Sequence, residues 1–101
     1  MSERSVRLRE EIKREVSFIL QRKVKDPRLG FVSVTDVDLT RDLSYCKIFV
    51  SIFGDDQVKE QTMLGLTKAT GFVRSELAKT LRLRQVPEIS FHYDPSLEYG
   101  S

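Results

Sequence analysis

"FVSVTDVDLTRDLSYCKIFVSIF", residues 31–53, consists of two alternating runs of apolar and polar residues joined by a short polar turn. In the second run Cys46, Ile48, Val50 and Ile52 fall on one face, and the residues between them fall on the other. Alternation of period two is typical of a strand that is buried on one face only. We expect the two runs to form an antiparallel hairpin.

The alternation in the first run slips by one position. Val32 and Val34 point to one face, whereas Val37 and Leu39 resume the pattern one residue late. A strand can keep all four side chains on one face only if it accommodates one extra residue. The sequence therefore predicts a β-bulge at Thr35–Asp36.

A helix is predicted on each side of this hairpin. The first lies between Glu3 and Val24, before the "KDPRLG" turn; the second runs from a cap at Asp55 or Asp56 to about Leu83, where "QVP" ends it. Apolar residues recur at helical spacing in both. The core-facing sets are Leu8, Ile12, Val16, Ile19 and Leu20 in the first helix, and Met63, Leu66, Val73, Leu77 and Leu81 in the second.

A third strand, "EISFHYD" at residues 88–94, follows the second helix and places Ile89, Phe91 and Tyr93 on one face. The length of 101 residues, with 40% hydrophobic and 32% charged residues, indicates one globular domain spanning 1–101. No apolar run approaches the roughly 20 residues of a membrane helix, and the N-terminus lacks the apolar stretch of a signal peptide. One cysteine suits a reducing compartment, so we expect a cytoplasmic protein without membrane contact.

Positive charge is concentrated in two blocks. Residues 1–28 carry nine Lys or Arg against five Asp or Glu, and residues 68–86 carry five against one. Residues 29–67 and 87–101 are each net acidic by three charges. If the basic blocks lie side by side they form one positive face of the kind that binds polyanions. The alternative is that they are separate solvated helix surfaces.

Residues that could carry chemistry are few. His92 is expected on a strand surface, Cys46 in the core, and Asp36 with Asp38 as a solvated pair without a third cation ligand. The sequence has no phosphate loop, no serine elbow and no cysteine cluster of metal spacing. We therefore predict no enzyme, no metal and no cofactor.

Gly71 is the one local anomaly, because glycine costs about 1 kcal/mol relative to alanine inside a helix. It is expected to face outward, on the arc that also carries Lys68, Ser75, Lys79 and Arg82. A kink there would begin a new helix at about Phe72, whose free amides would attract phosphate. The alternative is that glycine allows close packing.

Two segments resemble bacterial ribosome-binding factor A. They are "VKDPRLGFVSVTDVDLTRDLSYCKIFVSIFGDD" and "ATGFVRSELAKTLRLRQVPEISFHYDPSLEYG", which together span most of the chain. The resemblance implies an α+β fold, a type II KH-like domain with the order α-β-β-α-(kink)-α-β and a three-stranded sheet backed by helices. It also implies an alanine-x-glycine signature in place of the GxxG loop, and Ala69-Thr70-Gly71 matches that signature.

The function implied by the resemblance is non-enzymatic assembly of the ribosome. Members of the family bind the free 30S subunit and its 16S rRNA and assist late maturation and processing, including at low temperature. We expect a monomer. The residues expected to face RNA are Lys68, Ala69, Gly71, Arg74, Ser75, Lys79, Arg82 and Arg84 from the second helix region, with Arg7, Lys13 and Arg14 from the first.

Two features depart from the family pattern. The sequence stops at Gly100-Ser101, where many members continue into a charged tail, so the chain is either shortened or naturally short. Without a GxxG loop, it need not bind single strands as ordinary KH domains do.

Two other classes of function stay open at this level. A glycine between helices also fits a helix-turn-helix DNA-binding motif, although no Gln or Asn is available on its second helix to read adenine. An exposed sheet edge could instead recruit a protein partner.

Overall fold

The computed structural model describes residues 3–24 and 32–95, which form two helices and three strands. The elements follow one another as α1 (Glu3–Arg22), β1 (Val32–Leu39), β2 (Tyr45–Ile52), α2 (Asp56–Leu81) and β3 (Glu88–Tyr93). The turn expected at "KDPRLG" lies outside the described residues.

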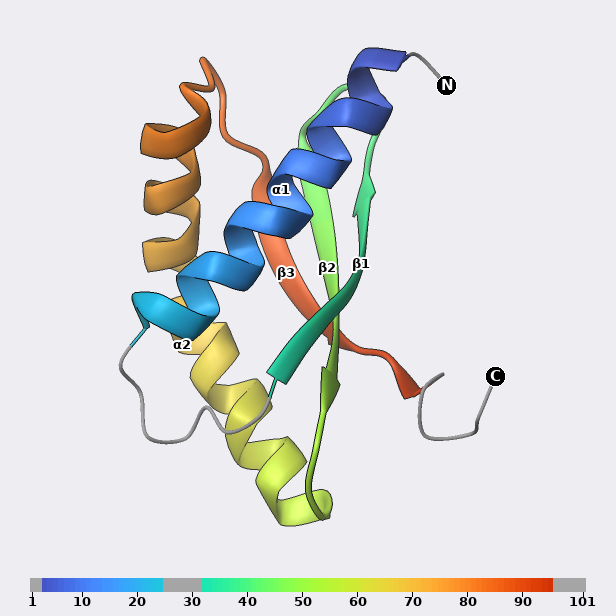
Figure 1. Cartoon of the computed structure of the whole chain (residues 1–101), viewed down its shortest axis with the longest axis vertical. Coiled ribbons are helices and arrows are strands. Elements are labelled where there is room, and N and C mark those ends of the chain that lie inside the picture. Colours follow the sequence, from blue (N-terminus) through green and yellow to red (C-terminus); the bar gives the residue numbers. More distant parts are fainter. Residues whose placement is uncertain (1–2, 25–31, 96–101) are drawn as a thin grey trace.

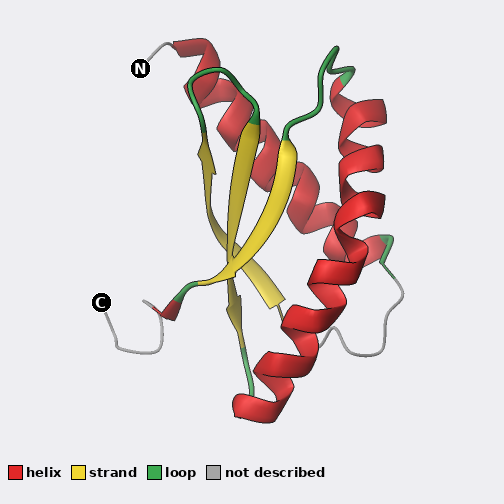
Figure 2. Ribbon diagram, turned by 180° about the vertical axis from the view of Figure 1, so that it is seen from behind, coloured by secondary structure: helices red, strands yellow, loops and turns green. Residues whose placement is uncertain are grey.

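The three strands form one sheet in the order β1-β2-β3, and both helices cover the same face of it (Figures 1 and 2). β1 and β2 are antiparallel and form the expected hairpin, whereas β2 and β3 are parallel. Parallel neighbours need a crossover, which α2 provides. Within residues 3–24 and 32–95, neither helix covers the other face of the sheet (Figure 2).

The bulge predicted in β1 is confirmed. Val34 pairs with Val50 and Asp36 pairs with Phe49, so that Thr35 has no partner in the ladder. The bulge moves Val37 to the helical side, where it is almost fully buried. A slip of one residue would otherwise have turned it to solvent.

The core lies between the sheet and the two helices, as the apolar spacing predicted. Each helix contributes buried side chains at steps of three and four, and β2 contributes every second residue. The buried apolar residues are Ile12, Val16, Ile19, Leu20, Val37, Cys46, Ile48, Val50, Ile52, Leu66, Val73, Leu77 and Ile89. Leu8, Met63, Leu81, Phe91 and Tyr93 are partly buried against them.

Both helices end slightly earlier than their apolar patterns suggested. Asp55 caps α2, accepting from the backbone amide of Val58 at 2.9 Å. At the other end Arg82 adopts a left-handed conformation with φ 50° and ψ 44°, which stops the helix at Leu81. The spacing of apolar residues does not reveal a non-glycine residue in this conformation, which is why the predicted end of the helix was near Leu83.

Candidate nucleic-acid interface

The two faces of α2 differ sharply in chemistry. Leu66, Val73 and Leu77 are buried against the sheet, whereas Lys68 and Lys79 are exposed on the opposite arc. Ser75 is exposed on the same arc, one turn before Lys79. Ser75 and Lys79 are neighbours four residues apart, and Lys68 lies two turns before Ser75 on the same arc, so these polar side chains form one stripe that is interrupted at Gly71.

The helix does not break at Gly71. α2 is continuous from Asp56 to Leu81, and Gly71 has no positive φ. The expectation of a second helix beginning at Phe72 is therefore wrong, because the amides there belong to the hydrogen-bond ladder of α2. A Cβ built at Gly71 meets nothing within 4 Å, so close packing does not require the glycine either.

The helix bends instead of breaking. Figures 1 and 2 show α2 changing direction partway along its length. The Thr70 hydroxyl donates to the carbonyl of Thr67 at 2.6 Å, and the Thr67 hydroxyl donates to that of Met63 at 2.9 Å. Such back-bonding, together with glycine, bends helices without interrupting them. Ala69 lies partly buried against the core, so its side chain faces inward.

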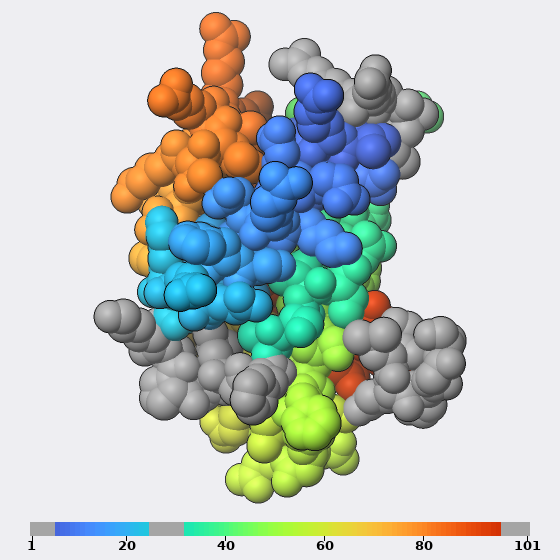
Figure 3. All heavy atoms as spheres, viewed as in Figure 1, coloured from blue at the N-terminus to red at the C-terminus, as the bar shows by residue number. Residues whose placement is uncertain are grey.

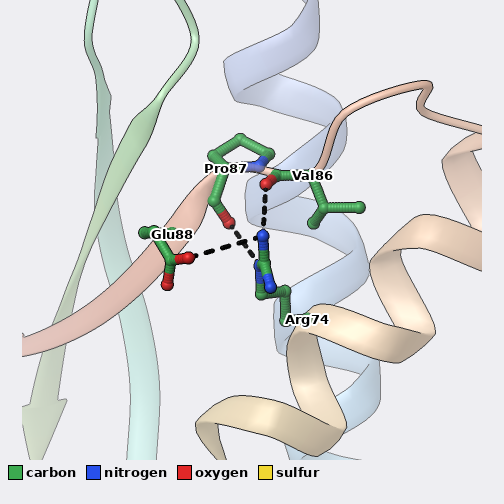
Figure 4. A network of polar contacts seen from close by, with 4 residues as sticks. All are labelled: Arg74, Val86, Pro87 and Glu88. Carbon is green, nitrogen blue, oxygen red and sulfur yellow. Dashed lines mark hydrogen bonds and ion pairs between the residues drawn. The ribbon is translucent and has the colours of Figure 1, made fainter.

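Arg74 is committed to contacts within the chain (Figure 4). Its Nε donates to the carbonyl of Pro87 at 3.1 Å, and its Nη2 donates to that of Val86 at 2.9 Å. The same Nη2 lies 3.5 Å from a carboxylate oxygen of Glu88. Arg74 thus ties α2 to the start of β3. Nothing in its local sequence distinguished this role from RNA contact.

Glu76, the only acidic residue within residues 68–86, is paired across the two helices. Its carboxylate lies 3.6 Å from Nζ of Lys23, just beyond the end of α1. The pairing offsets the one negative charge beside the basic stripe, which therefore stays positive toward solvent.

The end of α2 carries two more exposed basic side chains, Arg82 and Arg84. Arg82 also forms the left-handed C-cap, so it has a conformational role in addition to its charge. Its position just past the last helical turn places a cation near free carbonyls, which is favourable.

α1 brings its own basic residues to the same side of the molecule. Arg7 and Arg14 are exposed, whereas Lys13 is half-buried at the flank of the helix. An open groove of about 370 Å³ separates the helices, and its lining residues are Glu11, Arg14, Glu15, Thr80 and Leu81. α1 and the end of α2 therefore adjoin (Figure 3), and the described parts of the two basic blocks lie on these neighbouring helices, but the carboxylates of Glu11 and Glu15 interrupt the positive surface between them.

Two aromatic residues on this surface were missed. Phe18 on α1 is 49% exposed and Phe72 on α2 is 44% exposed. Sequence reasoning assigns an apolar helical residue to the core unless its angular position is checked. Phe72 follows Lys68 by four residues, and that spacing places it on the basic arc.

Cys46 and His92 are positioned as structural residues. Burial, followed by the charge of Asp38, raises the pKa of the Cys46 thiol to about 11. His92 lies beside the ring of Phe49, with 5.7 Å between centroids, and shares a hydrogen bond with the Ser90 hydroxyl. Among residues 3–24 and 32–95, no three His, Cys, Asp or Glu side chains gather as metal ligands would. No helix there is long and apolar enough to cross a membrane.

The continuity of α2 also removes the helix-turn-helix alternative for this segment. That motif needs two helices joined by a short turn, and the glycine proposed for the turn lies within an unbroken helix.

Comparison with known protein sequences places the chain in one family. A family model described as ribosome-binding factor A matches residues 4–101. The ribosome-binding factor A of Natranaerobius thermophilus is 56% identical over 97 residues, covering 96% of this chain and 74% of that protein.

Solved structures give the same result. The crystal structure of ribosome-binding factor A from Thermus thermophilus matches with a TM-score of 0.78 at 27% identity, covering 87% of this chain and 92% of the other. A homology model of the Thermus thermophilus factor, fitted into the cryo-EM map of a 30S–RbfA complex, matches with a TM-score of 0.73 at 26% identity, covering 86% and 91%. The expected α+β, KH-like fold is confirmed. With a family match over nearly its whole length, this chain belongs to the ribosome-binding factor A family.

Proposed function

We propose that this protein binds the free 30S ribosomal subunit through 16S rRNA and assists its late maturation and processing in the cytoplasm, including at low temperature. It does so as a monomeric binding factor and not as an enzyme. Family membership supports this proposal, as does the 30S complex into which the Thermus thermophilus relative was fitted.

The observation that carries the RNA contact is the basic stripe of α2. Lys68 and Lys79 are exposed on one face, with the Ser75 hydroxyl between them. Arg82 and Arg84 extend the stripe past the end of the helix, and Arg7 and Arg14 add charge from α1. Exposed cations in such an array neutralise phosphates and release counterions.

The segment Ala69–Gly71 acts in this proposal through the bend of α2 and not as a phosphate clamp. A true GxxG loop would present backbone amides to RNA. Here the backbone is helical throughout, so the contacts to phosphate come from side chains. Lys13, which is half-buried, contributes less than Arg7 and Arg14.

The decisive experiment is a charge reversal that leaves packing intact. Lys68→Glu with Lys79→Glu changes two exposed residues of α2, and its binding to purified small subunits is measured by co-sedimentation at several salt concentrations. Arg82 is left unchanged because it caps the helix. The control is Lys47→Gln, which removes an exposed charge from the sheet face opposite the helices without placing a carboxylate against its cross-strand partner Asp38.

We expect the double variant to lose small-subunit binding and the control to retain it. The logarithm of the binding constant falls linearly with the logarithm of the salt concentration, and each lost phosphate contact should reduce the magnitude of that slope, the salt slope, by about one. Full binding by the folded double variant would contradict the proposed face. Binding that barely responds to salt would favour recruitment through a sheet edge instead.

A further inference from the structure

Two exposed aromatic rings lie within the basic helical surface. Phe18 and Phe72 are each about half exposed, which forgoes part of the roughly 1.5–3 kcal/mol that full burial of such a side chain provides. Both project from well-packed helices whose other faces fill the core. Both rings can therefore be reached from solvent, although Nζ of Lys23 lies over the Phe18 ring at 6.0 Å from its centroid, so a ligand would use the other face of that ring.

Basic side chains flank each ring along its helix. Phe72 lies one turn after Lys68, and Lys79 follows on the same face two turns later. Phe18 lies one turn from Arg14 on one side and one turn from Arg22 on the other, and both arginines are exposed.

Lys23 contacts Phe18 on the preceding helix α1 and Glu76 on α2, close to Phe72. Its Nζ lies 6.0 Å from the centroid of the Phe18 ring and 3.6 Å from the carboxylate of Glu76. Glu76 is one helical turn, about 5.4 Å, along α2 from Phe72. In Figure 3 the cyan end of α1 adjoins α2, so the helices form one surface.

We propose that Phe18 and Phe72 stack unpaired nucleobases of RNA while the surrounding lysines and arginines neutralise its phosphates. This rests on the proposed function and deepens it by naming single-stranded RNA as the substrate. Aromatic faces interleaved with cations are the usual means of binding single strands with little sequence preference. A duplex keeps its bases stacked inside and cannot offer them to these rings.

Tryptophan substitution tests the stacking directly, because the chain contains no tryptophan. Phe18→Trp and Phe72→Trp each add a single fluorophore, to be titrated with a ten-nucleotide single-stranded RNA of mixed sequence and with the blunt duplex of that sequence. We expect quenching by the single strand and little by the duplex. Phe53→Trp, at an 80% exposed position between β2 and α2, is the control and stays unquenched.

Leucine substitution measures the contribution to affinity. Phe18→Leu with Phe72→Leu keeps apolar helix formers but removes both rings, and affinity for the single strand should fall roughly 30-fold or more. The salt slope should not change, because no charge is lost. Lys68→Glu with Lys79→Glu should change that slope.

The outcomes separate the two proposals. If the leucine variant binds the single strand normally, stacking is overturned; the proposed function still stands if the charge reversal abolishes co-sedimentation with small subunits. If the leucine variant no longer binds small subunits but binds the single-stranded RNA normally, the rings contact a ribosomal protein and stacking is again overturned. If both variants bind small subunits normally, both proposals fail.

Discussion

The hydroxyl of Thr35 donates to a carboxylate oxygen of Asp94 at 2.8 Å, joining the bulge of β1 to the end of β3 across the width of the sheet. The same hydroxyl lies 3.3 Å from the carbonyl of Phe49 on the central strand. Thr35 is the residue without a ladder partner, so its side chain supplies the cross-strand contact that its backbone lacks. The bulge thereby links all three strands.

Replacing Thr35 with valine should lower the free energy of unfolding by about 1–3 kcal/mol. The change keeps the shape of the side chain but removes the donor from a charged acceptor, and such hydrogen bonds are among the stronger ones. Urea denaturation measures the effect. Thr35→Ser retains the hydroxyl and should lose less; a Thr35→Val variant as stable as the parent, with a loss only in Thr35→Ser, would show that the methyl group matters and the hydrogen bond does not.

Arg74→Lys should destabilise the protein although it preserves the charge. A lysine cannot donate in the fork geometry that reaches the carbonyls of Pro87 and Val86 together. We expect a loss of about 1–2 kcal/mol in urea denaturation, with little effect on binding to small subunits once the protein is folded.

Arg84→Lys is the matched control for this substitution. Arg84 is exposed and follows the same helix, so the change should leave stability within about 0.5 kcal/mol. If Arg74→Lys keeps its stability but binds RNA poorly, Arg74 belongs to the interface after all.

The thiol of Cys46 should be protected and pH-sensitive. Its pKa is raised from 9.0 to about 11, chiefly by burial. The unfolded chain therefore releases the proton first, so stability from this group is complete below pH 9 and is lost as pH rises through 11. The loss should amount to about 2–3 kcal/mol.

Comparison with Cys46→Ala isolates this effect from other groups that titrate at high pH. The variant should be about 1–2 kcal/mol less stable at pH 7 but decline less between pH 9 and 11. Thiol reagents should label the native protein at least roughly a hundredfold more slowly than the denatured one. Rapid labelling in buffer would contradict the buried position.

Most of the fold was predictable because its signals are local and periodic. The slip between Val34 and Val37 located the bulge, and the apolar steps of both helices identified their buried faces. Parallel pairing of β2 with β3 has no such signal in the strands themselves. It follows only once the connection through α2 is known.

The interface was predictable only as a charge pattern. Arg74 and Lys79 look equivalent in sequence, yet Arg74 meets carbonyls contributed by a loop twelve and thirteen residues away. Phe72 was overlooked because its ring is apolar, although its spacing from Lys68 places it outside the core. Whether a given lysine or arginine is available to bind RNA depends on its tertiary contacts, and the spacing of residues along the sequence does not predict those contacts.

The last prediction compares Gly71 with Gly54, and the backbone and surroundings of Gly54 tolerate a side chain less well. Gly71 has ordinary helical geometry and open space where a Cβ would lie, so Gly71→Ala should stabilise the protein by about 0.5–1 kcal/mol. Gly54, between β2 and α2, has a φ of +146°, and a Cβ there would lie 2.7 Å from the side chain of Val58.

Gly54→Ala should therefore cost about 1–3 kcal/mol, because it combines backbone strain with a clash against a stiff β-branched side chain. Thermal and urea denaturation of the two alanine variants, measured side by side, check the opposite signs. Small-subunit binding should be unchanged in Gly71→Ala, because the bend is also supported by the hydroxyls of Thr67 and Thr70. If Gly71→Ala instead lowers both stability and binding, the glycine itself sets the bend, and the direction of the basic stripe depends on it.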